Sequence, residues 1–402
     1  MTNCLIITLG LLLALGISIY LVPVVIRLVK ALRLFDHPNE RSSALRPIPT
    51  LGGIAIFLSF VFAVTISTYG NELPGLIYIF AALLLMFVVG LKDDIVDLPP
   101  WKKLVAEMIA AGCIIIFAKI RFTSLHGFFG IEEISLLPSI IITTFFIIVI
   151  INAFNLMDGI DGLAAGLSIL YASIFGFWFL VNDHLDYAIL SFTLVGSIAG
   201  FFYFNVFGGE NKIFMGDTGS LVLGTILSVI VIQFNEFNIN PISHFPVKSA
   251  PAVAFGILIY PLIDTLRVFI IRVLHKKSPF TPDKNHLHHR LLVLGFSHRK
   301  ASFTIILTNM LFIIPVFALH DIGIIWLMAF IILVSGILFT LPAYFIKKKN
   351  LIVYNDPHQQ LLTISLKRKT MKYNDSENIF EREKFTSKIL KIQMLLQKLN
   401  IW

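Results

Sequence analysis

The chain has 402 residues, of which 57% are hydrophobic and only 14% are charged, and its mean hydropathy is +0.85. Soluble domains carry about 25% charged residues, so this composition excludes an ordinary soluble globule. The formal net charge is +8. Because the basic excess falls in loops between apolar stretches and in the tail after Lys347, we attribute it to membrane topology and expect no nucleic-acid binding. Cys4 and Cys113 lie in apolar stretches without partner spacing, which excludes a disulfide framework and a cysteine metal cluster.

Apolar stretches of about 20 residues, long enough to cross a bilayer as helices, recur from Cys4 to Ile346. We therefore predict an all-α polytopic membrane protein with about 10 to 11 transmembrane helices. The first stretch has no charged segment before it and is followed by basic residues, so it is expected to span the membrane rather than to be a cleaved signal peptide. The expected spans are 4–30, 50–69, 75–91, 103–119, 138–152, 162–181, 187–204, 219–234, 250–271, 301–319 and 322–345.

The lysines and arginines predict how these spans are oriented. With the N-terminus outside, the outer loops hold little beyond Lys119, Arg121 and Lys248, as the positive-inside rule requires. An odd number of spans then places the C-terminus in the cytoplasm. The basic residues of the inner side are Arg33, Arg41, Arg46, Lys92, Lys102, Lys103, Lys212, Arg272, Lys276, Lys277, Lys284, Arg290 and Arg299.

The composition changes after residue 346, which predicts a transmembrane domain over residues 1–346 and a basic cytoplasmic tail over 347–402. Within the tail, residues 385–399 repeat apolar side chains at helical spacing and predict an amphipathic helix. A membrane-surface helix, a partner-binding helix and a merely solvated tail remain open.

Three carboxylates fall within five residues where the third expected span ends, in the segment Lys92–Asp97, and Lys103 follows as the next span begins. Neighbouring carboxylates repel one another at a membrane edge unless cations compensate them, and Mg²⁺ prefers such oxygen ligands while keeping positions for substrate phosphates. Asp93, Asp94 and Asp97 therefore indicate a metal and phosphate site. The alternative is a solvated loop at a helix end.

Polar residues are spaced by three at the inner end of the fifth expected span, in the segment Asn152–Gly162. Asn155, Asp158 and Asp161 would lie on neighbouring positions of one helix face. The glycines between them permit close approach of a substrate or of another backbone. The spacing therefore favours a binding site over a plain loop.

Asp217 stands between glycines just before the eighth expected span, in the segment Phe214–Ser220. A carboxylate in this setting suits a metal ligand beside a phosphate. A helix that opens at Thr218 to Ser220 would also present unpaired backbone N–H groups to an anion. The alternative is that Asp217 caps the N-terminus of this helix.

Three histidines and several cations crowd the loop after the ninth expected span. Such a cluster could bind zinc, but without a nearby cysteine it also suits a cationic clamp for a diphosphate, and we favour the phosphate. Asp264 and Arg267, spaced by three within the ninth span, predict a buried structural ion pair. The residues of the cluster are His286, His288, His289 and Arg290.

Five segments in chain order resemble the polyprenyl-phosphate N-acetylhexosamine-1-phosphate transferase superfamily. The resemblance covers residues 1 to about 345, and the first segment taken alone would indicate only a turn and a helix start. The segments are Arg46–Gly53, Asp93–Asp97, Asn155–Gly162, Phe214–Ser220 and His286–Arg290.

The resemblance implies that the phosphate of undecaprenyl phosphate attacks the β-phosphate of a UDP-N-acetylhexosamine and releases UMP. It implies Mg²⁺ as the cofactor, with Mn²⁺ as a substitute, and a site on the cytoplasmic face of the bacterial inner membrane, surrounded by membrane lipid. A homodimer is left open. The implied metal ligands are Asn155 and Asp217, the implied catalytic residues are Asp93, Asp94, Asp217 and Lys103, and the implied substrate-binding residues are Thr50, Gly52, Asp97, Asp158, Asp161, Asn205, His286, His288, His289 and Arg290.

The branch of the superfamily follows from the histidine loop. The peptidoglycan branch, which transfers phospho-MurNAc-pentapeptide, carries a His-His-His-Phe-Glu type of loop, whereas this chain has Asn285–Leu291. This departure points to UDP-GlcNAc as donor and to the start of surface glycans such as O-antigen, enterobacterial common antigen or teichoic acid. The alternatives are the peptidoglycan branch, a related donor such as UDP-GalNAc or a 6-deoxy-N-acetylhexosamine, and, in a different class, a secondary transporter with ionisable residues near the bilayer midplane.

Whether Asp93 or Asp94 deprotonates the lipid phosphate or attacks as a nucleophile is not settled by the resemblance. A phosphate monoester is already largely ionised near pH 7, so we hypothesise direct attack by the lipid phosphate without a covalent intermediate. Phosphoryl transfer depends mostly on positioning and on charge compensation, tasks that suit Mg²⁺, Lys and Arg.

Overall fold

The computed structural model describes residues 2–32, 35–36, 48–68, 75–239, 244–276 and 285–355. It divides into two units, Met1–Pro342 and Ala343–Trp402. The expected amphipathic helix at 385–399, together with the segments around Arg46 and Asp283, lies outside the described residues.

Helices make up nearly all of the described chain, which confirms the all-α fold class. The helices are α1 (Thr2–Leu32), α2 (Gly52–Ser67), α3 (Leu76–Ile95), α4 (Pro100–Gly112), α5 (Leu136–Met157), α6 (Leu163–Val181), α7 (Leu185–Phe207), α8 (Gly216–Phe237), α9 (Ala250–Ile257), α10 (Ile259–Leu274), α11 (Leu287–Val293), α12 (His298–Ala318) and α13 (Ile324–Asn355). A π-helical turn, Cys113–Phe117, continues α4, and a 3-10 turn, Gly209–Asn211, follows α7. Two short antiparallel strand pairs, which were not predicted, are β1 (Phe35–Asp36) with β2 (Ile48–Pro49) and β3 (Ser124–Phe128) with β4 (Ile131–Glu133).

Each of the eleven expected spans coincides with helix, but fewer of them are unbroken spans. In the described residues, eight helices are long and apolar enough to cross a membrane, or up to nine if one bent pair counts as a span. The expected spans 50–69 and 103–119 are the exceptions in length: α2 has 16 residues and α4 has 13 before the π-helical turn. At 1.5 Å per residue, neither reaches the bilayer core thickness of about 30 Å.

The expected span 250–271 is broken into α9 and α10, which meet at an angle of 77°. Pro261 lies in the first turn of α10. Its ring would clash with the carbonyl of Ile257 if the helix continued, and it has no N–H to bond there, so the chain breaks at Leu258 and starts a new helix.

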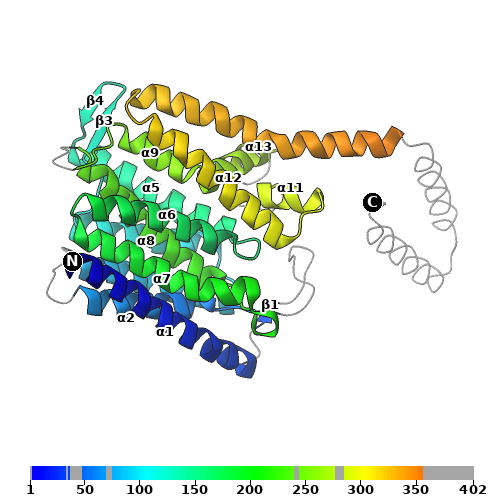
Figure 1. The fold of residues 1–402 in the computed structure, drawn as a ribbon, viewed down its shortest axis with the longest axis horizontal. Coiled ribbons are helices and arrows are strands. Elements are labelled where there is room, and N and C mark those ends of the chain that lie inside the picture. The colour runs from blue at the N-terminus through cyan, green and yellow to red at the C-terminus, as the bar shows by residue number, and fades with distance from the viewer. Residues whose placement is uncertain are drawn as a thin grey trace. The chain divides into compact units, whose positions relative to one another are not determined.

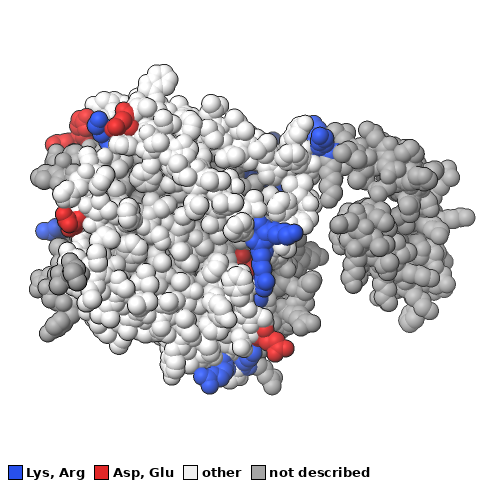
Figure 2. Space-filling model, viewed as in Figure 1, with Lys and Arg blue, Asp and Glu red and all other residues white. Residues whose placement is uncertain are grey.

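The core of the first unit is built around α8. In the most apolar 18-residue stretch of each helix, 83% of α8 is buried inside the protein, against 28% of α1. Helix α8 is therefore an interior helix and α1 a peripheral one. Helices α2, α3, α5 and α6 pack directly on α8, while α7 packs between α6 and α1. The helices run side by side in Figure 1, with the N-terminus and the β3–β4 hairpin at one end and β1 and α11 at the other. Figure 2 shows charged side chains at these ends and a wide uncharged band between them, as expected of a membrane protein.

Close backbone contact between α3 and the start of α8 depends on Gly90. A Cβ atom at this position would lie 2.7 Å from the carbonyl oxygen of Asp217 and 2.7 Å from the backbone nitrogen of Thr218. Backbone atoms cannot yield as a flexible side chain can, so the glycine sets how near the two helices approach.

We expect Gly90→Ala to lower the free energy of unfolding by about 1–3 kcal/mol, because the added methyl forces the two backbones apart. The matched control is Gly16→Ala in α1, where a Cβ would meet nothing within 4 Å. Thermal unfolding of the purified protein in detergent measures both. Equal stability of the two variants would contradict the role given to Gly90.

Candidate active site

The Asp94 carboxylate at the end of α3 caps the N-terminus of α8. Its Oδ1 accepts a hydrogen bond from the Asp217 backbone N–H at 2.8 Å, and its Oδ2 accepts from the Thr218 backbone N–H at 2.9 Å and from the Thr218 hydroxyl at 2.5 Å. An anion in this position satisfies helix N–H groups that lack intrahelical partners and lies at the positive end of the helix dipole. The sequence predicted an anion site here, and in the structure a carboxylate of the same chain occupies these two N–H groups.

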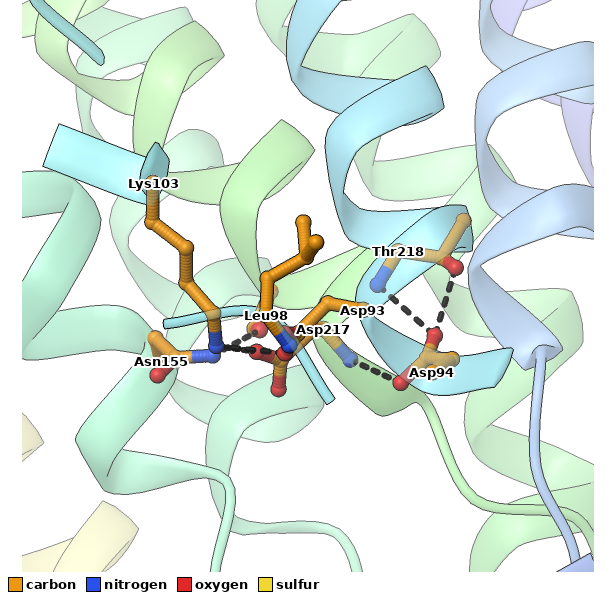
Figure 3. Close-up of polar contacts among 8 residues, drawn as sticks. Asp93, Asp94, Leu98, Lys103, Asn155, Asp217 and Thr218 are labelled. Carbon is orange, nitrogen blue, oxygen red and sulfur yellow. Dashed lines mark hydrogen bonds and ion pairs between the residues drawn. The ribbon is translucent and has the colours of Figure 1, made fainter. Parts of the chain in front are cut away.

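The alternative interpretation of Asp217 as an N-cap is wrong. The N-cap residue of α8 is Met215, without a side-chain cap, and Asp217 lies inside the first helical turn. Its carboxylate instead turns toward Lys103 (Figure 3). The contact with Asp94 that caps the helix also positions the Asp217 backbone, and the ion pair with Lys103 orients the Asp217 carboxylate.

Lys103, in the first turn of α4, bridges carboxylates from two other helices. Its Nζ lies 2.6 Å from Asp217 Oδ2 and also forms an ion pair with Asp93 Oδ2 (Figure 3). The other Asp93 oxygen accepts a hydrogen bond of 2.6 Å from the Leu98 backbone N–H, in the turn that leads into α4. Asp217 keeps 27% of its side chain exposed, so the group stays accessible to a ligand. The structure thus brings Asp93, Lys103 and Asp217 into one cluster.

Asn155, near the end of α5, lies beside this cluster, with its amide nitrogen toward Lys103 and Asp217 (Figure 3). Its Nδ2 donates a 3.0 Å hydrogen bond to Ser220 Oγ on α8, which leaves the amide oxygen Oδ1 as the free acceptor. Asp217 and Asn155 therefore offer the hard oxygen ligands that Mg²⁺ prefers. No three His, Cys, Asp or Glu side chains in the described part of the chain converge as a metal site, so a divalent cation would also need amide, water or substrate oxygens.

The loop after α5 places two further aspartates in different surroundings. Asp161 Oδ2 lies 2.6 Å from Lys212 Nζ and 3.5 Å from His298 Nδ1. Burial alone would raise the pKa of Asp161, but the contacts with His298 and Lys212 outweigh it and hold the pKa below its ordinary value. The Asp158 carboxylate forms no hydrogen bond or ion pair with described residues, and the Asp158 N–H donates a 3.3 Å bond to the Asn155 carbonyl. Burial, followed by the negative charge of Asp217 and Asp94, raises the pKa of Asp158 to about 7.

Asn205 supports this loop from α7. Its Oδ1 accepts a 2.7 Å hydrogen bond from the Gly162 N–H, and its Nδ2 donates a 2.9 Å bond to the Ile213 carbonyl. With 5% of its surface exposed, Asn205 uses its amide to join the Asp161 loop to the segment before α8. Both hydrogen bonds of Asn205 go to backbone groups, so it positions the loop and does not present its amide to a ligand.

The histidine cluster is anchored by the ion pair that the sequence predicted in the ninth span. Arg267 Nη2 lies 2.8 Å from Asp264 Oδ1, which confirms that pair. Asp264 also accepts a hydrogen bond from the Leu287 N–H at 3.0 Å and lies 2.8 Å from His286 Nδ1. Arg267 in turn donates to the Asn285 carbonyl at 2.5 Å. Asp264 and Arg267 therefore hold the start of α11, which carries the cluster.

His288 connects this cluster to the aspartate loop. A Cβ on Gly159 would lie 2.5 Å from His288 Nε2, so the imidazole packs directly on the glycine between the two loop aspartates. Burial, followed by the nearby His289, lowers the pKa of His288 to about 3. It stays neutral at pH 7, so the positive charge predicted for this clamp cannot come from His288. Arg290 and His289 are half-buried at its side.

Three predicted residues lie at the edge of these clusters. Gly52 is buried, and its N–H donates a 2.9 Å bond to the Phe214 carbonyl, so it contacts the segment before Asp217 through backbone. Thr50 is half-buried beside it. Asp97 is exposed and forms no hydrogen bond or ion pair with described residues, so the structure leaves it outside the Lys103 cluster.

Comparison with known proteins places the chain in a family. The model of glycosyl transferase family 4 matches residues 76–235, which hold Asp93, Lys103, Asn155 and Asp217. An undecaprenyl-phosphate alpha-N-acetylglucosaminyl 1-phosphate transferase of Yersinia pestis is 32% identical over 272 residues, 67% of this chain and 72% of the relative. Its namesake from Escherichia coli K12 is 31% identical over 278 residues, 68% and 73% of the two chains. A probable undecaprenyl-phosphate N-acetylglucosaminyl 1-phosphate transferase of Bacillus subtilis is 31% identical over 318 residues, 78% and 84%.

The chain belongs to glycosyl transferase family 4. Membership confirms the resemblance found in the sequence, and it covers the helices that carry the Lys103 cluster. Around the loop after α5, the structure adds residues that the sequence pattern did not assign to a site. Lys212 and His298 flank Asp161, and Ser302 donates a 2.6 Å bond to the Asp161 carbonyl. The sequence marked Lys212 only as a basic residue of the inner side, and it gave no indication that His298 or Ser302 belongs to the site.

The two adjacent aspartates of α3 are expected to differ in what they stabilise. Asp94→Asn replaces one of two accepting oxygens by an NH₂ group that faces backbone donors, so it should lower the free energy of unfolding by about 2 kcal/mol. Asp93→Asn still accepts from Leu98 and should lose less, because Lys103 keeps Asp217 as a partner. Thermal unfolding in detergent compares the two. A larger loss in Asp93→Asn would contradict the capping role of Asp94.

Proposed function

We propose that this member of glycosyl transferase family 4 transfers N-acetylglucosamine 1-phosphate from UDP-GlcNAc to undecaprenyl phosphate, and so starts the synthesis of a cell-surface glycan. All three relatives are named for undecaprenyl phosphate and for the N-acetylglucosaminyl group. That shared name favours this donor over UDP-MurNAc-pentapeptide.

The observation that carries the proposal is the cluster of Asp93, Lys103 and Asp217 where three helices end or begin. A secondary transporter would place such charges near the middle of broken helices. Here the carboxylates and the ammonium lie at helix ends, where a soluble nucleotide sugar and a lipid phosphate can meet. The arrangement supports group transfer at the membrane surface.

In the proposed reaction, an oxygen of the lipid phosphate attacks the β-phosphorus of UDP-GlcNAc. The bond from that phosphorus to the bridging oxygen breaks, and the bridging oxygen leaves on UMP. Lys103 and Arg290 would offset charge on the phosphate oxygens, and Asp93 would orient Lys103. Asp161, kept ionised by Lys212 and His298, and neutral His288 would line the donor side.

A divalent cation fits the oxygen donors of Asp217 and Asn155, with Mg²⁺ as the expected ion and Mn²⁺ as a substitute. When bound, such an ion supplies Lewis-acid stabilisation of charge on the transferred phosphoryl group. The chain's own part is to fix the ligands: Asp94 holds the Asp217 backbone, and Ser220 holds the Asn155 amide.

We further propose that the site faces the cytoplasm of a bacterial inner membrane. Described basic residues gather at the helix ends that carry the site, including Lys92, Lys102 and Lys212, whereas the opposite end holds fewer of them, namely Lys119, Arg121 and Lys248. The positive-inside rule then assigns the site to the cytoplasm and the N-terminus, which lies at the other end, to the outside (Figure 1).

Purified full-length protein given undecaprenyl phosphate, Mg²⁺ and UDP-GlcNAc should release UMP, and EDTA should abolish the release. Asp217→Asn should lower the rate by roughly 100-fold or more, since it removes a charged ligand at the reacting phosphate. UDP-GalNAc and UDP-MurNAc-pentapeptide are tested in parallel. Activity with UDP-MurNAc-pentapeptide alone would overturn the choice of donor, and no UMP from any donor would overturn the proposed reaction.

Direct attack by the lipid phosphate predicts that no phosphorylated protein forms. Protein incubated with UDP-GlcNAc labelled in its β-phosphate, without undecaprenyl phosphate, should remain unlabelled after acid quenching. Label on Asp93 or Asp94, located by mass spectrometry, would establish a covalent intermediate and contradict direct attack.

A further inference from the structure

Glu107 is a buried carboxylate that the proposed reaction does not use. It lies in α4, one turn beyond Lys103, with 2% of its surface exposed. Its Oε2 accepts a 2.7 Å hydrogen bond from Asn152 Nδ2 on α5. Asn152 is the one hydrogen-bond donor to Glu107 among the described residues. A buried carboxylate with a single amide donor is poorly compensated, so a nearby cation stabilises it strongly.

The Lys103 ammonium is the cation nearest along the same helix. Residues four apart on a helix lie on one face with their Cβ atoms about 5–6 Å apart, so Lys103 can reach Glu107 by rotating its own side chain. The same geometry holds on the facing helix, where Asn152 and Asn155 are three apart. Glu107 and Asn152 therefore form a second polar layer directly behind Lys103 and Asn155.

Lys103 cannot keep its ion pairs with both Asp93 and Asp217 once a divalent cation binds. The ammonium occupies Asp217 Oδ2 and pairs with Asp93. An ammonium and a divalent cation on one carboxylate repel each other by about 2 kcal/mol or more at 4 Å even at an effective dielectric of 20 to 80. With the cation on Asp217, the ammonium needs another anion, and before substrate phosphate is present the buried Glu107 is the carboxylate within reach on its own helix.

We propose that Glu107 is a positioning residue that accepts the Lys103 ammonium when a divalent cation binds Asp217. Lys103 then moves between the Asp93 and Asp217 carboxylates and the Glu107 carboxylate. The inference rests on the proposed metal site. Lys103 then competes with the cation for Asp217, and Glu107 lowers the free energy of the displaced state.

The test measures Mn²⁺ binding to the purified full-length protein without substrates, by electron paramagnetic resonance. Glu107→Gln keeps an oxygen that can accept from Asn152 but loses the charge, and it should weaken Mn²⁺ binding roughly tenfold. Lys103→Met removes the competing ammonium and should tighten binding. The double variant Lys103→Met/Glu107→Gln should bind Mn²⁺ as Lys103→Met does, because without the Lys103 ammonium the charge of Glu107 no longer affects binding.

Glu236→Gln is the matched control. Glu236 is also a carboxylate held by neutral donors, Thr123 N–H and Thr123 hydroxyl, but it lies at the far end of α8, so its variant should bind Mn²⁺ as the wild type does. Unchanged Mn²⁺ affinity in Glu107→Gln would overturn the proposal. An equal loss in the Lys103→Met background would also overturn it, since the effect would then be structural. A wild type that binds no Mn²⁺ would overturn the metal site itself, and this inference with it.

Discussion

The hydrogen bonds from the start of α8 to the Asp94 carboxylate are the constraint on which the rest of the site depends. They join two helices that are distant in the chain, where α3 ends and the largely buried α8 begins, and unpaired N–H groups at such a helix start would be destabilising. Once Asp94 is bound in this way, Asp93 is turned toward α4, because successive helix residues point about 100° apart. Asp217 is fixed on the other side by its own N–H. Both carboxylates therefore meet Lys103 without further adjustment.

Charge accounts for the form of this cluster. Asp93, Asp94 and Asp217 are three carboxylates, whereas the compensation within reach is the Lys103 ammonium and the N-terminal end of the α8 dipole, equivalent to about half a charge. The centre stays net negative. In the proposed reaction, a divalent cation would offset this negative charge before the phosphates of two anionic substrates bind.

The sequence was sufficient for the fold class and for the motifs, because apolar runs of bilayer length and carboxylates at their ends are local signals. It was insufficient where the outcome depends on contacts between helices. Asp217 was indistinguishable from an N-cap, since the cap that replaces it comes from Asp94 on another helix. Glu107 fell within an expected span and looked like one charge in an apolar run, and its partner Asn152 lies 45 residues away. The break at Leu258 had a local signal in Pro261, which hydropathy averaged over a window does not register.

The broken span has a consequence for the donor side of the site. Helix α10 packs on α5, the helix that ends in the aspartate loop, and it carries Asp264 on its buried face. Asp264 holds the N-terminal end of α11, and α11 in turn brings His288 against Gly159. A straight helix through residue 258 would continue the direction of α9 and carry Asp264 away by the 77° that now separates the two axes. The kink at Pro261 therefore determines whether the histidine cluster faces the aspartates Asp158 and Asp161.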